Sequence, residues 1–375
     1  MRIITLFLLI TILFGCKKST PDPSPSPTPT PTPTVNNITI RGVDLSYTPE
    51  IRSFGTVYKY NNTAGDILDI IKARGINTVR LRLWYAPATV RSGLAEVISF
   101  ATEIKNKGLS VFLDLHYSDT WADPGQQTKP LAWQSANLAG LKDSVYQYTK
   151  RVLQAFVAAG ATPSIVQIGN ETNGGLLWNE GRVGGSYDAN WAEFANLLKK
   201  GIQAVKEVDP SIKTMIHYAG YSGAQQYFSN INTQGVSYDY IGLSYYPVFH
   251  GKDMDALASG MSSLVSSFNK PILIAETDYP FTLSWNDQTN NTVGLPDQLI
   301  PSYPATLSGQ AAFLTALLKK VNALGTKGLG VCYWSPDLVA YKGTSSTTGS
   351  FMENQALFDF SNNAVPGLDS LGRAF

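Results

Sequence analysis

The stretch Ser164-Ile165-Val166-Gln167-Ile168-Gly169-Asn170-Glu171 joins a short apolar run, rich in β-branched residues, to an acidic residue at its end. A second stretch, Pro271-Ile272-Leu273-Ile274-Ala275-Glu276, has the same form. Runs of this length and composition are typical of strands buried in a parallel sheet. A carboxylate at the C-terminal end of such a strand does not suit the packing of a core. In barrel and open α/β enzymes, however, the active site lies at the edge of the sheet formed by these strand ends. Glu171 and Glu276 are therefore candidate catalytic residues.

From residue 36 onward, short β-rich runs alternate with longer helical patterns. We expect strands at 38–46, 77–84, 110–116, 164–170, 213–218, 240–245, 271–276 and 328–334. Helices are expected at 65–74, 94–107, 138–159, 189–208, 223–232, 254–268 and 309–324, with a last one near 366–375. Several of these helices end at a glycine, as in Arg74-Gly75 and Lys107-Gly108. The pattern predicts a (β/α)₈ TIM barrel as a single catalytic domain over 36–375. The rival, a doubly wound sheet, lacks a Gly-rich phosphate fingerprint after the first strand.

The composition disfavours some classes of partner. The chain has 375 residues and a net charge of +1, so binding of nucleic acid gains no electrostatic support. Charged residues make up only 15%, while aromatic residues reach 11%, with 19 Tyr and 7 Trp. Aromatic faces serve as platforms for sugar rings, so this balance suits a carbohydrate-binding protein.

The first 35 residues have the features of an export signal and a linker. An apolar run follows Arg2 and ends in Leu13-Phe14-Gly15-Cys16, which resembles a bacterial lipoprotein box. We expect a signal peptide at 1–15, a lipidated Cys16, and a Pro/Thr-rich tether at 16–35 that links the enzyme to a membrane. The alternative is an ordinary secretory signal with a chance cysteine. Display at the cell surface and at the periplasmic face both stay open. Cys332, in an apolar run, is expected to be a buried residue.

Polar and aromatic residues collect where the expected strands end. Asp44 ends the first strand, and the histidines His116, His217 and His250 all fall at or near strand ends. A catalytic zinc would need three protein ligands, but no His-x-His or His-Glu-x-x-His spacing occurs. Hydrogen bonding to sugar hydroxyls and to the glutamates is the favoured role, and Asp44 and His217 are candidate substrate-binding residues. A serine hydrolase is disfavoured because there is no clear Gly-x-Ser-x-Gly elbow.

Glu171 and Glu276 fall on the fourth and seventh expected strands, on roughly opposite sides of an eight-stranded barrel. Their side chains can point at one another across the mouth. Hydrolysis of a glycosidic bond uses such a pair, with one acid and one nucleophile or base. A retaining mechanism needs about 5–5.5 Å between the carboxyl groups and an inverting one about 6.5–9.5 Å. The residues alone leave that choice open.

Seven motifs together resemble the endo-β-1,4-galactanases of glycoside hydrolase family 53. They are GVDLS at 42–46, VRLRLW at 79–84, HYSDTWADPG at 116–125, QIGNETNGG at 167–175, IGLSYYP at 241–247, ETDYP at 276–280 and ENQALFD at 353–359. The resemblance implies a retaining endo-hydrolase of β-1,4-galactan, the side chain of pectin. It implies that Glu171 is the acid/base, that Glu276 is the nucleophile and that Asn170 binds the 2-hydroxyl beside the reacting carbon.

The resemblance also assigns supporting residues. Those expected to orient the carboxylates are Arg82, His116 and Tyr245, with Arg82 keeping the nucleophile ionised. Trp334 would form the floor of the subsite where the sugar distorts, and the neighbouring subsites would be lined by Trp84, Trp121, Asp123 and Gln126.

No cofactor is expected for catalysis, but bacterial members of the family often carry calcium in the loops after the last two strands. Here Asp287 and Asn291 offer alternate oxygen ligands of the kind calcium prefers, and without an ion the segment is an Asx-rich turn. We expect a monomer. The alternatives to a galactanase are a related retaining barrel acting on another β-glycan, such as mannan or glucan, and a surface glycan-binding lipoprotein without turnover.

Overall fold

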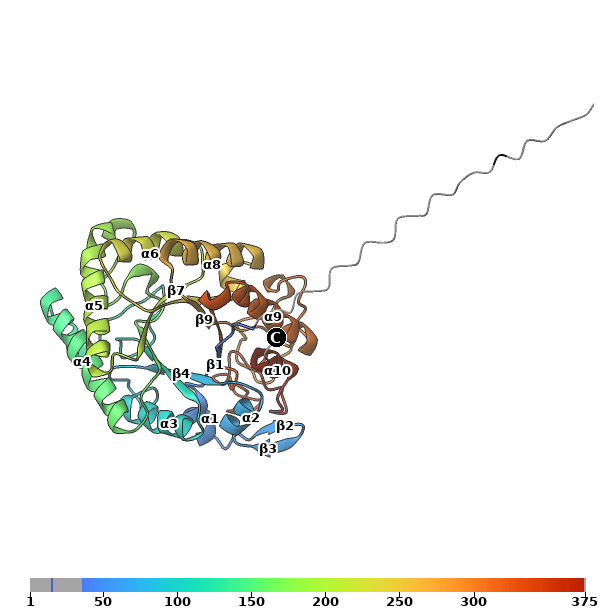
Figure 1. Ribbon diagram of the computed structural model, residues 1–375. Coiled ribbons are helices and arrows are strands. Elements are labelled where there is room, and N and C mark those ends of the chain that lie inside the picture. Colours follow the sequence, from blue (N-terminus) through green and yellow to red (C-terminus); the bar gives the residue numbers. More distant parts are fainter. Residues whose placement is uncertain (1–14, 16–35, 374–375) are drawn as a thin grey trace, which may run out of the picture. The chain divides into compact units, whose positions relative to one another are not determined.

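In the computed structural model, which describes Gly15 and residues 36–373, eight parallel strands close into a barrel (Figure 1). They are β1 (Ile40–Asp44), β4 (Thr78–Leu83), β5 (Ser110–Leu115), β6 (Ile165–Ile168), β7 (Lys213–Ala219), β8 (Tyr240–Ser244), β9 (Ile272–Glu276) and β10 (Gly328–Trp334). Around the ring the order is β1-β10-β9-β8-β7-β6-β5-β4, and every neighbouring pair is parallel. The predicted TIM barrel and its eight strands are confirmed. The predicted signal peptide, Cys16 and tether lie outside the described residues.

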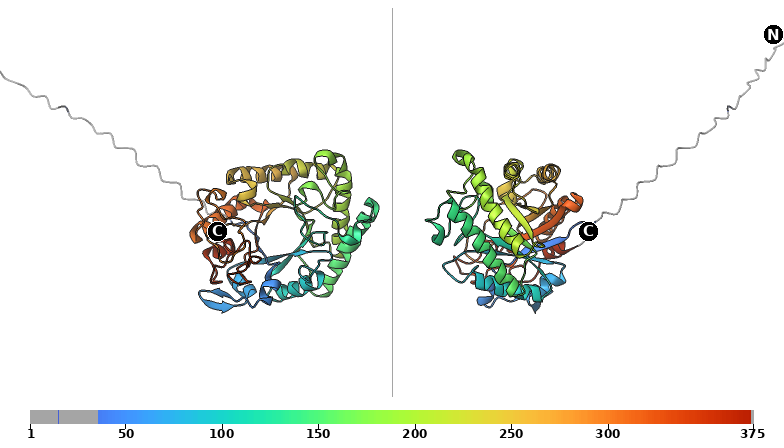
Figure 2. Two further views of the ribbon diagram at one scale, coloured as in Figure 1. Left: turned by 180° about the vertical axis from the view of Figure 1, so that it is seen from behind. Right: turned by 60° about the vertical axis from the view of Figure 1, so that its left-hand side comes forward.

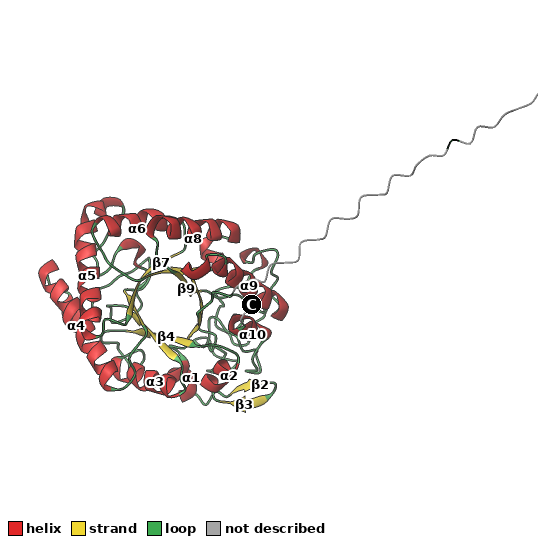
Figure 3. Ribbon diagram, in the orientation of Figure 1, coloured by secondary structure: helices red, strands yellow, loops and turns green. Residues whose placement is uncertain are grey.

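Helices form a ring outside the strands (Figure 3). They are α2 (Ile67–Ala73), α3 (Leu94–Asn106), α4 (Leu138–Ala158), α5 (Trp191–Val208), α6 (Ala224–Thr233), α8 (Met254–Phe268), α9 (Leu307–Asn322) and α10 (Pro366–Gly372). Their termini follow local chemistry: the Asp66 carboxylate accepts the Leu68 N–H at the start of α2, and Thr306 accepts the Gly309 N–H at the start of α9. The predicted glycine stops have positive φ, for example +95° at Gly75.

The sequence patterns missed the short elements. These are α1 (Thr48–Ser53), the hairpin of β2 (Tyr58–Tyr60) and β3 (Thr63–Gly65), and α7 (Pro247–His250). Short 3₁₀ helices occupy Leu131–Trp133, Thr172–Gly174, Gly185–Asn190, Pro296–Gln298 and Gly325–Lys327. Elements of three to six residues are too short for a periodicity to stand out from a loop.

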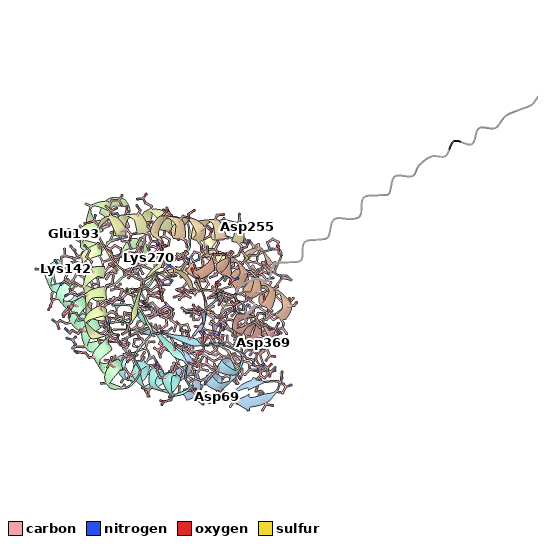
Figure 4. The ribbon with its side chains drawn as sticks, viewed as in Figure 1. Asp69, Lys142, Glu193, Asp255, Lys270 and Asp369 are labelled. Carbon is pink, nitrogen blue, oxygen red and sulfur yellow. The ribbon has the colours of Figure 1, made fainter. Side chains whose placement is uncertain are left out.

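The core has two parts because side chains alternate across each strand. One cluster contains Phe112, Ile165, Met215, Leu273, Ala275 and Leu329, all of them on or beside barrel strands. The larger cluster joins strand residues such as Leu113 and Ile274 to the apolar faces of the helices. The helices lie around the ring of strands, as the view from behind shows (Figure 2). Charged side chains such as Lys142 on α4 and Asp255 on α8 lie on the outer ring (Figure 4). Cys332 is fully buried, as expected.

The parallel direction of the strands decides where the chemistry can lie. Because all eight strands are parallel, their C-terminal ends meet at one mouth, where barrel enzymes place their active sites. Among the helices in the described part of the chain, none is long and apolar enough to cross a membrane.

Candidate active site

The two candidate acids open into one cleft at the C-terminal mouth of the barrel. Glu276 is the last residue of β9, and Glu171 comes three residues after the end of β6. The chain turns sharply there, with φ of +81° at Gly169 and +44° at Glu171. A Cβ on Gly169 would lie 2.7 Å from Thr172 Cγ2, so this turn requires glycine. The cleft has a volume of about 530 Å³, and both glutamates line it.

A guanidinium and a tyrosine hydroxyl hold Glu276. Arg80 Nη2 lies 2.7 Å from Glu276 Oε1, and the Tyr246 hydroxyl donates to Oε2 at 2.9 Å. Burial raises the pKa of Glu276 above its ordinary value, while the Arg80 charge and the Tyr246 hydrogen bond oppose that rise. The carboxylate is therefore fixed in position, and its two partners favour the ionised form against the effect of burial.

Arg80 also binds carboxylates on two other strands. Its Nη1 lies 2.8 Å from Asp44 Oδ2 on β1, and its Nη2 lies 2.8 Å from Asp114 Oδ2 on β5. Its guanidinium carbon lies 5.5 Å from the centre of the Phe112 ring, at the upper edge of the apolar barrel interior. Three carboxylates, those of Asp44, Asp114 and Glu276, share this one buried cation, so negative charge is in excess around it.

The Glu171 carboxyl has a different environment. Its Oε1 accepts a hydrogen bond of 2.5 Å from Ser244 Oγ, at the end of β8. Burial, followed by the charge of Glu276, raises the pKa of Glu171 to about 8. Because only Glu276 has an arginine partner, it is the first of the two to ionise. At neutral pH the pair therefore holds one proton, on Glu171.

His217 contacts both Ser244 and Asn170. Burial and the charge of Arg80 hold the pKa of His217 well below its usual range, so the imidazole is neutral. Its Nε2 lies 3.0 Å from Ser244 Oγ, the group that donates to Glu171. Its Nδ1 lies 3.0 Å from Asn170 Oδ1 and 3.1 Å from Gln167 Nε2. His217 is fully buried and does not line the cleft, so it supports Ser244 and Asn170 and is not placed to bind substrate as predicted.

Asn170, next to Glu171, is held at both ends of its amide. Its Nδ2 donates to the Ala122 carbonyl at 2.8 Å, and its Oδ1 accepts from Arg80 Nη2 and Gln167 Nε2, both at 3.0 Å. The amide nitrogen keeps a second hydrogen for another acceptor. Asn170 lines the cleft, so that acceptor could be a sugar hydroxyl.

The prediction that Arg82 orients the carboxylates is wrong, because Arg80 makes those contacts. Arg82 lines the cleft, but its guanidinium carbon lies 4.2 Å from the centre of the Tyr47 ring and 4.3 Å from that of the Trp121 indole. Its Nε donates to Ser92 Oγ at 2.8 Å. The two arginines are two residues apart and share one side of β4, so strand alternation alone does not distinguish them.

The same prediction is wrong for Tyr245, whose place beside Glu276 is taken by Tyr246. The Tyr245 side chain is fully buried against Phe313, and its hydroxyl donates to the Gly251 carbonyl at 3.1 Å. Neighbouring side chains at the end of a strand point to opposite sides, so only one of the two tyrosines can face the cleft.

His116 lines the cleft, but its direct partner is an aspartate and neither glutamate. Its Nε2 lies 2.9 Å from Asp114 Oδ2, and its Nδ1 accepts the Ala122 N–H at 3.1 Å. Any influence of His116 on Glu276 therefore passes through Asp114 and Arg80.

Of the residues predicted to line subsites, the cleft contains Asp44, Trp121, Asp123 and Trp334. Trp84 lies against the Trp121 ring at 5.4 Å, edge to face, and supports it without lining the cleft itself. Gln126 donates from Nε2 to Asp123 Oδ2 at 3.3 Å and likewise lies outside the lining.

Sequence reasoning missed several residues of this site. Arg80, Ser244 and Tyr246 lie within the motifs at 79–84 and 241–247, but nothing in a motif shows which of its residues faces inward. The cleft is also lined by Phe249, Asp278, Thr292, Phe351 and Met352. Of these, Phe249 is 65% exposed, an unusual state for a phenylalanine beside a cleft.

The two predicted calcium ligands, Asp287 and Asn291, form hydrogen bonds that join the loops after β9 and β10. Asp287 Oδ1 accepts the Thr289 N–H at 2.7 Å, and its Oδ2 accepts the Ser350 N–H at 2.8 Å. Asn291 Nδ2 donates to Glu353 Oε1 at 3.3 Å. Asn291 Oδ1 and Glu353 Oε2 are buried without a hydrogen-bond partner among the described residues. Over the same part of the chain, no group of three or more His, Cys, Asp or Glu side chains could hold a metal ion.

Comparison with known proteins agrees with this geometry. An arabinogalactan endo-β-1,4-galactanase of Cellvibrio japonicus is 36% identical over 337 residues, which cover 87% of this chain and 88% of that protein. The GH53 catalytic domain of Ignisphaera aggregans superposes with a TM-score of 0.85 at 39% identity and covers 91% of this chain and 98% of its own. A fungal β-1,4-galactanase structure gives a TM-score of 0.78 at 32% identity, with 90% and 99% covered. The family model described as Glycosyl hydrolase family 53 matches residues 40–371, and this chain is a glycoside hydrolase that belongs to that family.

Proposed function

We propose that this protein is a retaining endo-β-1,4-galactanase that cleaves the galactan side chains of pectin. The observation that carries the proposal is the pair of unlike carboxyl groups in one cleft, with Glu276 bound to Arg80 and Glu171 raised in pKa to about 8. The galactanases among its relatives, which match along nearly their whole length, support the substrate.

In the first step, Glu276 attacks the anomeric carbon and Glu171 protonates the departing glycosidic oxygen. The Arg80 ion pair and the Tyr246 hydroxyl hold the Glu276 carboxylate in place for this attack. The attack forms a galactosyl ester on Glu276 as the glycosidic C–O bond breaks, and proton transfer to the departing oxygen leaves Glu171 ionised.

In the second step, Glu171 takes a proton from water, which attacks the same carbon and releases Glu276. The change of role has an electrostatic cause. Once Glu276 is esterified, it no longer raises the pKa of Glu171 by its charge, so the same residue becomes a suitable base.

Release of reducing sugar from purified galactan tests this proposal, with mannan, β-glucan and arabinan as comparisons. We expect release from galactan, internal cleavage with early oligomeric products, and initial products with the β-configuration by ¹H NMR. Release from mannan or glucan alone would identify a related barrel glycanase, and binding of galactan without release would identify a glycan-binding protein.

Two substitutions test the assigned roles. Glu171→Gln and Glu276→Gln should each lower kcat by orders of magnitude, because each removes one half of the pair. Glu180→Gln is the matched control, since Glu180 pairs with Lys129 and does not line the cleft. Wild-type activity in either cleft variant would refute the assignment.

Calcium fits this chain poorly, and we assign it no step. Calcium takes six to eight oxygen ligands, whereas no group of three or more His, Cys, Asp or Glu side chains in the described part of the chain could hold a metal ion. The direct hydrogen bonds of Asp287 join the two loops without an ion. Asn291 Oδ1 and Glu353 Oε2 are the oxygen atoms there that would have to bind one.

For the N-terminal region, we propose export, lipidation at Cys16 and anchoring to a membrane as a monomer, at the cell surface or at the periplasmic face. The support is the Leu13-Phe14-Gly15-Cys16 box and the Pro/Thr-rich segment that follows it. Cys16→Ser should move the protein from the membrane fraction to the soluble fraction. Unchanged membrane association would refute the anchor.

A further inference from the structure

Asp278 is a carboxyl group in the active-site cleft for which the proposed mechanism has no role. It follows Glu276 by two residues, lines the same cleft and is 5% exposed. Within residues 36–373, no hydrogen bond or ion pair reaches its carboxyl, whereas Asp44 and Asp114 both bind Arg80.

An ionised Asp278 would be unfavourable at this position. Burial, and then the charge of Glu276, keep the pKa of Asp278 well above its usual range. A buried carboxylate without a counterion beside another carboxylate costs several kcal/mol, so the group keeps its proton instead. A neutral carboxylic acid offers one O–H donor and a free carbonyl acceptor, and neither has a partner among the described residues.

The surroundings of Asp278 limit what could occupy it. On one side is the main cleft, where Tyr246 and Thr292 also contribute to the lining. On the other side is a cavity of about 10 Å³ lined by Pro247, Val293 and other residues of the loops after β8 and β9. That space holds at most about one water molecule, so only the cleft side has room for a larger polar ligand.

We propose that Asp278 is a substrate-binding residue that forms hydrogen bonds with a hydroxyl of the galactosyl unit lying next to Glu276. A sugar hydroxyl both donates and accepts, so it matches the two unfilled functions of a neutral carboxylic acid. The inference rests on the proposed galactanase function and adds to it a contact that discriminates among sugars by the position of that hydroxyl.

Kinetics and binding with the full chain test this role. Asp278→Ala should lower kcat/KM on galactan by about 10- to 100-fold, the range for losing a hydrogen bond in a buried site. Asp278→Asn keeps a donor and an acceptor, so it should retain most of the activity. In a Glu171→Gln background, galactotetraose binding by calorimetry should weaken with Asp278→Ala and change little with Asp278→Asn.

Stability distinguishes binding from a structural role. Removing an unpartnered buried carboxyl should leave the melting temperature unchanged or raise it, as at other functional sites. Asp337→Asn is the matched control, because Asp337 is a buried carboxyl that binds Thr48 and lies outside the cleft lining; it should leave kcat/KM unchanged. A lower melting temperature with unchanged kcat/KM in Asp278→Ala would show that Asp278 is structural.

The outcomes also separate this inference from the proposed function. If the wild type cleaves galactan and Asp278→Ala cleaves and binds it equally well, the role of Asp278 is refuted and the galactanase stands. If Asp278→Asn and Asp278→Ala lose activity equally, hydrogen bonding by this side chain is refuted. If the wild type neither cleaves nor binds galactan, both proposals fail.

Discussion

The pKa of Glu171, raised to about 8, has two main causes that a single substitution separates. Burial is the larger cause, and the charge of Glu276 is the next. Glu276→Gln keeps the shape of the side chain and removes its charge. In this variant the pKa of Glu171 should fall but stay above 4.5, because the burial of the carboxyl is unchanged.

The size of the fall follows from the carboxyl spacing that a retaining mechanism requires. The change from 4.5 to about 8 amounts to about 5 kcal/mol against ionisation at about 1.4 kcal/mol for each pH unit. Two charges at the carboxyl spacing of a retaining enzyme, about 5 Å, interact by about 3 kcal/mol at an effective dielectric constant of about 20. Removing the charge of Glu276 should therefore lower the pKa of Glu171 by about 2 pH units.

Carboxyl ¹³C NMR on protein labelled at glutamate measures this titration directly. The Glu171 signal is the one that titrates near pH 8 and is absent from Glu171→Gln. In the wild type, kcat/KM should lose activity on the alkaline side with the same midpoint. Glu180→Gln, which removes a glutamate paired with Lys129 outside the cleft, is the control and should leave the signal unmoved. If the Glu171 titration is the same in Glu276→Gln and the wild type, the two carboxyls do not interact, and the mechanism loses its basis.

Three further perturbations have expected outcomes. The folded-state pKa of Glu171 lies above 4.5, so the folded protein binds more protons than the unfolded protein between that pH and about 8, and the contribution of this group to the free energy of unfolding is lost as pH rises through the window. Urea unfolding should therefore show Glu171→Gln equal to the wild type at pH 4 and more stable by a few kcal/mol at pH 9. The opposite order would contradict the raised pKa. Arg80→Met should reduce the free energy of unfolding by about 3–5 kcal/mol, because it leaves buried carboxylates unpaired. It should also reduce kcat at least about 100-fold, while Arg82→Met should reduce kcat far less. Equal losses of kcat in the two variants would contradict the assignment of Arg80. EDTA and added calcium should give the same melting temperature, because no group of three or more acidic, histidine or cysteine side chains in residues 36–373 could hold a metal ion; a clear rise with calcium would show that the loop binds the ion.

The strands and their order could be predicted from the sequence because a buried parallel strand leaves a strong local signature. The run before Glu171 and the run before Glu276 are apolar and β-branched, and both proved to be barrel strands. Once the strand count is eight, closure of the barrel brings their C-terminal ends to one mouth. The two glutamates could therefore be placed together without any knowledge of side-chain packing.

The partners of those glutamates could not be predicted, because they depend on side-chain direction at single positions. Arg80 and Arg82 lie on the same side of β4 and differ only in their position along the barrel axis. Arg80 therefore binds Glu276, while the Arg82 guanidinium lies over the rings of Tyr47 and Trp121. The pair Tyr245 and Tyr246 presents the same difficulty at the end of β8, where a shift of one residue exchanges the buried and exposed faces. Such choices become visible only when the loops above the barrel are in place.

The excess of negative charge around Arg80 connects these observations. Asp44, Asp114 and Glu276 place three carboxylates on one guanidinium, and a fold selected only for stability would replace some of them by apolar groups. Here the excess has a use, because the charge of Glu276 helps to keep the proton on Glu171 until esterification removes that charge. The alternation between acid and base then needs no movement of the chain. It needs only a carboxylate that is held by Arg80 and Tyr246 and stays close enough to Glu171 to affect its ionisation.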